Sequence, residues 1–330
     1  MKIDGILAIV TALLLLAAPA FVYPFLVMKM MCLALMAASF NLLFGYGGML
    51  SFGHAAFVGS AAYLTSYAVK TLQLPTPAAI LLGVALAAAI GLAFGLIAIR
   101  RRGIQFAMIT LALSQLVYFV FLQAPFTHGE DGIQDVPRGR IFGVINLESS
   151  LTMYYFILGI AILAFFAIYR MIESPFGQIV LAIRDNESRA TSLGYDISRY
   201  KLVILVIAAV IAGLAGALKA LLFQIATLND ATYLLSTEVV IVAVVGGIGT
   251  MTGPIAGAAA IVFLDWFFAE SEFPVMVING LVFMACVLLF RQGIVGTIVP
   301  LLENLMRRSA GQTSGRSSDL SDGKSYLEEA

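Results

Sequence analysis

Charged residues are scarce in this chain. They make up 12% of its 330 residues, whereas soluble domains average about a quarter. The 19 basic residues balance the 19 acidic ones, so there is no overall basic field to hold nucleic acid and no acidic bias toward cationic partners. The composition therefore argues against a soluble domain and against a nucleic-acid-binding surface.

Motifs for common catalytic chemistry are also lacking. No HExxH, GxSxG or Walker A pattern occurs, so metal, nucleophile and nucleotide sites have no signature. His54 and His128 are far apart, and Cys32 and Cys286 lie inside apolar runs without metal-ligand spacing. We therefore expect a chain with no catalytic residue, no metal site, no cofactor and no ATP hydrolysis of its own.

Hydrophobic residues, in contrast, make up 61% of the chain, and they form runs of about 20 residues, the length that spans a hydrocarbon core. We expect an all-α polytopic membrane protein with about ten transmembrane or re-entrant helices. The third, eighth and ninth runs are short or interrupted by glycine, which favours re-entrant or broken helices. The candidate spans are residues 5–22, 25–44, 52–69, 78–99, 104–123, 151–169, 202–225, 234–245, 253–269 and 274–290.

The basic residues predict the orientation, because Lys and Arg concentrate in cytoplasmic loops. Basic stretches follow the fourth, sixth and tenth spans, at 100–102, 170–201 and 291–308. Ten crossings then place both termini in the cytoplasm and the loop 124–150 on the outer side of the membrane, which is the periplasm if the chain is a bacterial inner-membrane protein.

We interpret the first apolar run and the C-terminal tail differently. The first run resembles a signal peptide, but the single basic residue before it and the many spans after it favour a retained helix. We expect one membrane domain over residues 1–308 and a disordered cytoplasmic tail over 309–330, which is rich in Ser, Gly and Asp.

Two Gly-rich interruptions lie about 200 residues apart and resemble each other. Such paired breaks indicate an internal repeat with a transport pathway at its interface. The alternative is that glycine merely allows close helix packing. The candidate pathway-lining residues are Gly47, Gly48, Ser51, His54, Gly246, Gly247 and Gly253.

A few ionisable residues occur within or near the spans: Lys29, Lys219, Glu238 and Asp265. Each costs about 2.5–3.5 kcal/mol at a helix centre unless it is paired or near an interface. A transport role is one interpretation. The other is that Lys29 and Asp265 reach the interface while Lys219 and Glu238 pair across two helices.

The most informative segment, residues 173–196, follows the sixth span. Ser174 and Pro175 are typical of a helix start, and apolar residues at helical spacing give one apolar face. Asp185 or Asn186 can cap a second short helix, which Gly194 can end. The pattern predicts a helical hairpin outside the membrane. It can rest on the membrane surface, but its run of mixed charge favours a protein partner.

This segment resembles the cytoplasmic coupling loop of branched-chain amino-acid ABC transporter permeases of the LivM type. Four more segments resemble that family in the same order: FGYGGMLSFGHAAF at 44–57, QFAMITLALSQ at 105–115, THGEDGIQDVP at 127–137 and VVGGIGTMTGPIAGA at 244–258. Together they cover nearly the whole membrane part. His128, Glu130 and the tail depart from the family pattern.

The resemblance implies a permease subunit of an ABC importer in the bacterial inner membrane. Its expected partners are a second permease of the LivH type, two cytoplasmic ATP-binding subunits, a periplasmic substrate-binding protein and membrane lipid. The expected substrates are leucine, isoleucine and valine. Within the coupling loop 173–200, the residues expected to meet the ATPase subunits are Ile183, Arg184, Asp185, Asn186, Glu187 and Gly194.

Two alternative functions stay open. Permeases for urea or other amides are similar members of the same family, and one sequence does not identify the side chains that choose the solute. A secondary transporter would share the broken helices, but it would need an ion relay that this chain barely offers and no coupling hairpin.

Overall fold

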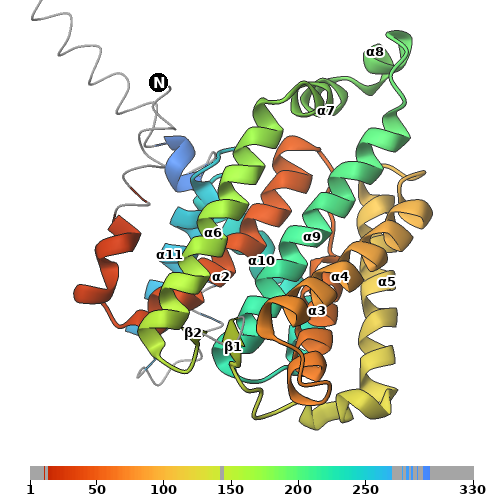
Figure 1. Ribbon diagram of the computed structural model, residues 1–330. Helices are drawn as coiled ribbons and strands as arrows, with labels where there is room; N and C mark the ends of the chain where they lie inside the picture. The colour runs from red at the N-terminus through yellow and green to blue at the C-terminus, as the bar shows by residue number, and fades with distance from the viewer. Residues whose placement is uncertain are drawn as a thin grey trace, which may run out of the picture.

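The computed structural model describes residues 14–141 and 145–269, together with residue 11, positions 277, 280, 281, 284 and 288, and residues 293–297. In this part of the chain the fold is a bundle of helices with one short β-hairpin at its edge (Figure 1). Helices suit this composition because a bilayer core offers no water to backbone groups, and a helix satisfies them internally. The predicted class, a polytopic helical membrane protein, is confirmed.

Five helical segments are long and apolar enough to cross a membrane. The first is Pro24–Tyr46, which consists of α2 (Pro24–Asn41) followed by a π-helical turn (Leu42–Tyr46). The other four are α4 (Thr76–Ala98), α5 (Ile104–Gln123), α6 (Ser150–Glu173) and α9 (Ile197–Phe223). Three shorter helices are α3 (His54–Lys70), α10 (Tyr233–Gly246) and α11 (Gly253–Phe267).

These eight helices match the second to ninth predicted spans to within a few residues. Of the first span, 5–22, only residue 11 and residues 14–22 are described. The tenth span lies largely outside the described residues, and the tail 309–330 lies wholly outside them. The count of ten, the retained first helix and the nature of the tail therefore stay predictions.

Helix α3 packs against α4 and α9. Most of its side chains are buried, including Phe57 and Tyr63. Small residues allow this close packing, because they let helix backbones approach each other. A Cβ atom added at Gly216 of α9, for example, would lie 2.8 Å from the Cα atom of Val58 in α3.

The bundle has two different ends. At one end lie the short helices α7 (Pro175–Asp185) and α8 (Glu187–Ser192), and at the other end lies the hairpin of β1 (Arg140–Ile141) and β2 (Ile145–Asn146) (Figure 1). In this hairpin Arg140 pairs with Asn146 and Ile141 with Ile145. The sequence did not predict the β-hairpin.

The loop before the β-hairpin is tied to the bundle. It holds two 3₁₀ turns (Pro125–Thr127 and Gly129–Asp131). Ile133 pairs with Ala226 through two backbone hydrogen bonds of 2.9 Å, and the Lys70 ammonium donates to the carbonyl of Gln134 at 2.7 Å.

The basic loop between α4 and α5 lies at the end that carries α7 and α8. Arg102 Nε forms an ion pair with Glu187 Oε2 at 2.8 Å. Charge alone predicted that these two stretches share one side, with loop 124–150 on the other, and the fold has this arrangement. Which end faces the cytoplasm stays a prediction.

The close contact at Gly216 gives a test of the packing. We expect Gly216→Val to destabilise the folded protein by about 1–3 kcal/mol, because overpacking forces neighbouring atoms apart. The measurement is the Tm of the protein in detergent. Gly159→Val in α6 is the matched control, since a Cβ atom there meets nothing within 4 Å. Equal Tm values for the two variants would show that the α3–α9 contact is not tight.

Candidate functional site

The predicted hairpin is present, with the predicted caps. Ser174 accepts a hydrogen bond from the backbone of Gly177, and Pro175 begins α7. Asn186 caps α8 by accepting from the backbone N–H of Arg189 at 3.0 Å. Gly194, at φ +87°, follows the end of α8 in the left-handed conformation that favours glycine. We call α7, α8 and the turn through Gly194 the α7–α8 hairpin.

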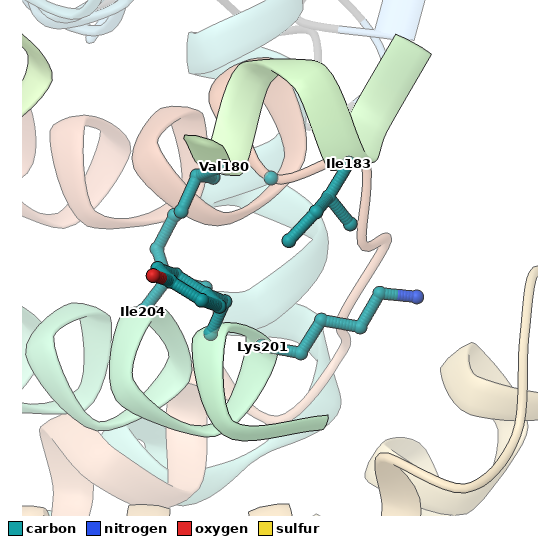
Figure 2. A pocket seen from close by; sticks show the side chains of 6 residues that line it. Val180, Ile183, Lys201 and Ile204 are labelled. Carbon is teal, nitrogen blue, oxygen red and sulfur yellow. The ribbon is translucent and has the colours of Figure 1, made fainter. Parts of the chain in front are cut away.

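The apolar face of α7 packs on the start of α9. Val180 and Ile183 point toward Ile204 (Figure 2), and with Gly47 they line a crevice too narrow to admit a water molecule. Val180 is 4% and Ile183 is 2% exposed. Ile183, predicted to meet a partner, thus seats α7 on the bundle in this structure.

Two charged residues of the hairpin also bond within the chain. Arg184 Nη1 donates to the backbone carbonyl of Gly45 at 2.6 Å, while its other nitrogens bond Asp185. Glu187 pairs with Lys201 on α9 as well as with Arg102. The hairpin is therefore joined to three other parts of the bundle: the π-helical turn, α9 and the loop before α5.

The two Gly-rich interruptions meet directly beside Arg184. The Asn41 side chain accepts from the backbone N–H of Gly249 at 2.7 Å and donates to the carbonyl of Thr250 at 2.8 Å. A Cβ atom added at Gly45 would lie 2.7 Å from the nitrogen of Gly249, so only glycine fits there without a shift. We call Asn41, Gly45, Gly249 and Thr250 the Asn41 junction.

The glycines that sequence analysis assigned to the pathway make close backbone contacts. Gly48 has φ +69°, and a Cβ atom there would lie 2.8 Å from Cγ of Arg184. Gly246 and Gly253 pack against each other where α10 turns into α11, with Gly247 between them at φ +120°. These contacts match the packing interpretation, and a pathway role stays a prediction.

Ser51 and His54 lie deeper in the bundle. Ser51 is fully buried, and its hydroxyl accepts from the backbone N–H of Gly53 at 3.1 Å. His54 is 1% exposed, begins α3 and packs against the rings of Phe40 and Phe57. Neither residue contacts the α7–α8 hairpin through a hydrogen bond found among the described residues.

Sequence analysis missed Asn41, the residue that joins the two Gly-rich segments. Its signal was a single amide side chain at the end of an apolar run, directly before the first Gly-rich segment. Asn41 is 3% exposed, and a buried amide needs hydrogen-bond partners. The sequence could indicate that need, but it could not indicate partners more than 200 residues away.

The tip of the hairpin presents apolar surface. Leu193 is 70% and Tyr195 is 39% exposed. In Figure 1, α7 lies across the end of the bundle and α8 projects beyond it. Arg189 and Asp185, close to Leu193 in the chain, are also exposed, so the tip presents an apolar side chain among charged ones.

Comparison with known proteins identifies the family. Residues 22–290 match the family described as branched-chain amino acid transport system / permease component. The chain belongs to this family of permeases.

Two similar proteins carry the name "High-affinity branched-chain amino acid transport system permease protein LivM". The one from Salmonella typhimurium is 25% identical over 300 residues, which cover 83% of this chain and 69% of that protein. The one from Escherichia coli K12 is 26% identical over 291 residues, covering 80% and 67%. No solved structure matches. The resemblance to LivM-type permeases is confirmed.

The bond from Arg184 to Gly45 gives a test of how the permease holds its hairpin. The Arg184 side chain is partly exposed, so this bond contributes roughly 1 kcal/mol. We expect Arg184→Ala to open the hairpin several-fold more often, measured as faster amide hydrogen exchange over residues 177–192. Arg199→Ala is the control, because the ion pair of Arg199 with Asp196 is exposed. Equal exchange in both variants would remove Arg184 from this role.

Proposed function

We propose that this chain is the permease subunit of a binding-protein-dependent ABC importer for leucine, isoleucine and valine in the bacterial inner membrane. In this proposal the permease forms the translocation pathway with a second permease of the LivH type. Two cytoplasmic ATP-binding subunits hydrolyse ATP, and a periplasmic binding protein delivers the substrate. The family match and the names of the two similar proteins support the transport class and the substrate.

The observation that carries the coupling role is the projecting α7–α8 hairpin at the basic end of the bundle. Its backbone is capped at each helix start, and its inner face is packed on α9. A rigid, exposed element with an apolar tip suits a protein partner that moves. A helix that rested only on lipid would not need α8 to project beyond the bundle.

The six residues expected to meet the ATPase subunits divide into two groups. Ile183, Arg184 and Glu187 hold the hairpin to the bundle, so we propose that they transmit movement rather than make the main contact. Asp185, Asn186 and Gly194 are exposed. We add Leu193 to this exposed group, as the apolar anchor of the contact.

The transmission step follows from the same contacts. When ATP binding closes the two ATPase subunits, the hairpin would move with them, and Arg184 would pull on the carbonyl of Gly45. Through Asn41, that pull reaches the backbone of Gly249 and Thr250. Both Gly-rich segments would therefore shift together, which is how a rigid-body change could alter the pathway. On this proposal the two segments are corresponding parts of an internal repeat.

The docking contact can be tested at Leu193. We expect Leu193→Asp to reduce leucine uptake and ATPase co-purification about tenfold or more, because a hot-spot apolar residue contributes 2 kcal/mol or more to binding. Leu72→Asp is the matched control, since Leu72 is 51% exposed after α3, at the opposite end of the bundle. Full co-purification of both ATPase subunits with the Leu193 variant would reject this contact.

The substrate is tested with the complete transporter in proteoliposomes. We expect ATP-dependent uptake of labelled leucine, isoleucine and valine, and no uptake of urea, at matched amounts of the transporter. A complex without ATP is the control. Uptake of urea but not of leucine would agree with the family and contradict the proposed substrates. Leucine uptake that follows an ion gradient and needs no ATP would instead favour a secondary transporter.

A further inference from the structure

Charged side chains form a layer in the bundle away from the α7–α8 hairpin. Lys29 of α2 pairs with Asp265 of α11, with 3.1 Å between Nζ and Oδ2. Lys219 of α9 pairs with Asp230, with 2.7 Å between Nζ and Oδ1. Three of these side chains stay partly open, at 37% exposure for Lys29, 22% for Asp265 and 27% for Lys219, while Asp230 is 7% exposed.

Both pairs lie near the same end of the bundle. The ring of Phe25, at the start of α2, packs against that of Phe223, at the end of α9, with centroids 5.3 Å apart. At 1.5 Å per residue, Lys29 lies about 7.5 Å and Lys219 about 6 Å inside those helix ends. This is the end that also holds the β-hairpin, the outer end under the proposed orientation.

Glu238 lies near this layer on the open face of α10. Tyr233 and Leu234 of that face are 50% and 47% exposed, and Glu238 follows one turn later. Helix α10 packs against α2 and α11, the helices that carry Lys29 and Asp265. Among the described residues, no ion pair or hydrogen bond of its side chain is found, whereas the four other charged groups are paired.

The layer therefore holds three carboxylates and two ammonium groups, and the carboxylate in excess is Glu238, which is half-buried. Ionisable side chains at membrane depth are costly unless they are paired or face a polar pathway. A ligand with an ammonium group would pair with Glu238, and Lys219 or Lys29 could attract its carboxylate. A zwitterionic amino acid has both groups, whereas urea has neither.

From this arrangement we propose that Glu238 binds the α-ammonium group of the amino acid as it enters the pathway from the outer end. The face of α10 would then line the pathway between the two permeases. This inference rests on the proposed function and adds a residue that recognises the substrate. It also gives a physical reason for choosing amino acids over uncharged amides.

The test uses the complete transporter in proteoliposomes, supplied with loaded binding protein at saturation. The variant is Glu238→Gln, which keeps the shape of the side chain and removes its charge. We expect leucine uptake to fall at least tenfold while the subunit composition of the complex stays unchanged. Glu238→Asp should restore part of the uptake, because it restores the carboxylate. Glu130→Gln, in the exposed outer loop, is the control and should transport normally.

Three outcomes would overturn the inference. Unchanged uptake by Glu238→Gln would show that the carboxylate does not bind substrate. Loss of the second permease from the purified complex would show that Glu238 pairs with that subunit instead. A wild-type complex that moves urea and no leucine would reject both the proposed substrate and this role, whereas normal leucine uptake by wild type and variant alike rejects the role of Glu238 alone.

Discussion

The close approach of Gly45 to Gly249 is the constraint on which the rest of this structure depends. It lets the backbones of two segments about 200 residues apart in sequence lie against each other, and Asn41 joins them through two hydrogen bonds. A larger residue at Gly45 would separate the segments. Arg184 donates a hydrogen bond to the backbone carbonyl oxygen of Gly45. The hairpin at the end of the bundle is therefore attached to both Gly-rich segments at one point.

Because charged residues are scarce in this chain, its few polar contacts are important. In a chain that is 61% hydrophobic, apolar packing positions the helices but offers little that distinguishes one state from another. The polar contacts divide by place: Arg184 and Glu187 attach the hairpin, while Lys29, Lys219 and Glu238 lie toward the other end. The proposed importer would need both, because energy would enter at one end and substrate at the other.

The sequence predicted most of the fold because the governing signals are local. Hydropathy located α4, α5 and α6 to within a few residues, and Ser174 and Asn186 located the helix starts of the hairpin. The site was harder. The inward positions of Ile183 and Arg184, and the bonds of Asn41, depend on contacts between distant segments, which residue spacing does not encode.

If the hairpin couples the permease to ATP, it and the Asn41 junction move as one body when nucleotide binds. Distances between spin labels test this directly in the full transporter with its native cysteines replaced. One label is placed at exposed Leu72, at the outer end. The second label is placed either at Ser188 in the hairpin or at Met251 beside the junction. We expect the 72–188 and 72–251 distances both to change between the nucleotide-free and ATP-bound states. A change in the 72–188 distance with no change in the 72–251 distance would contradict it.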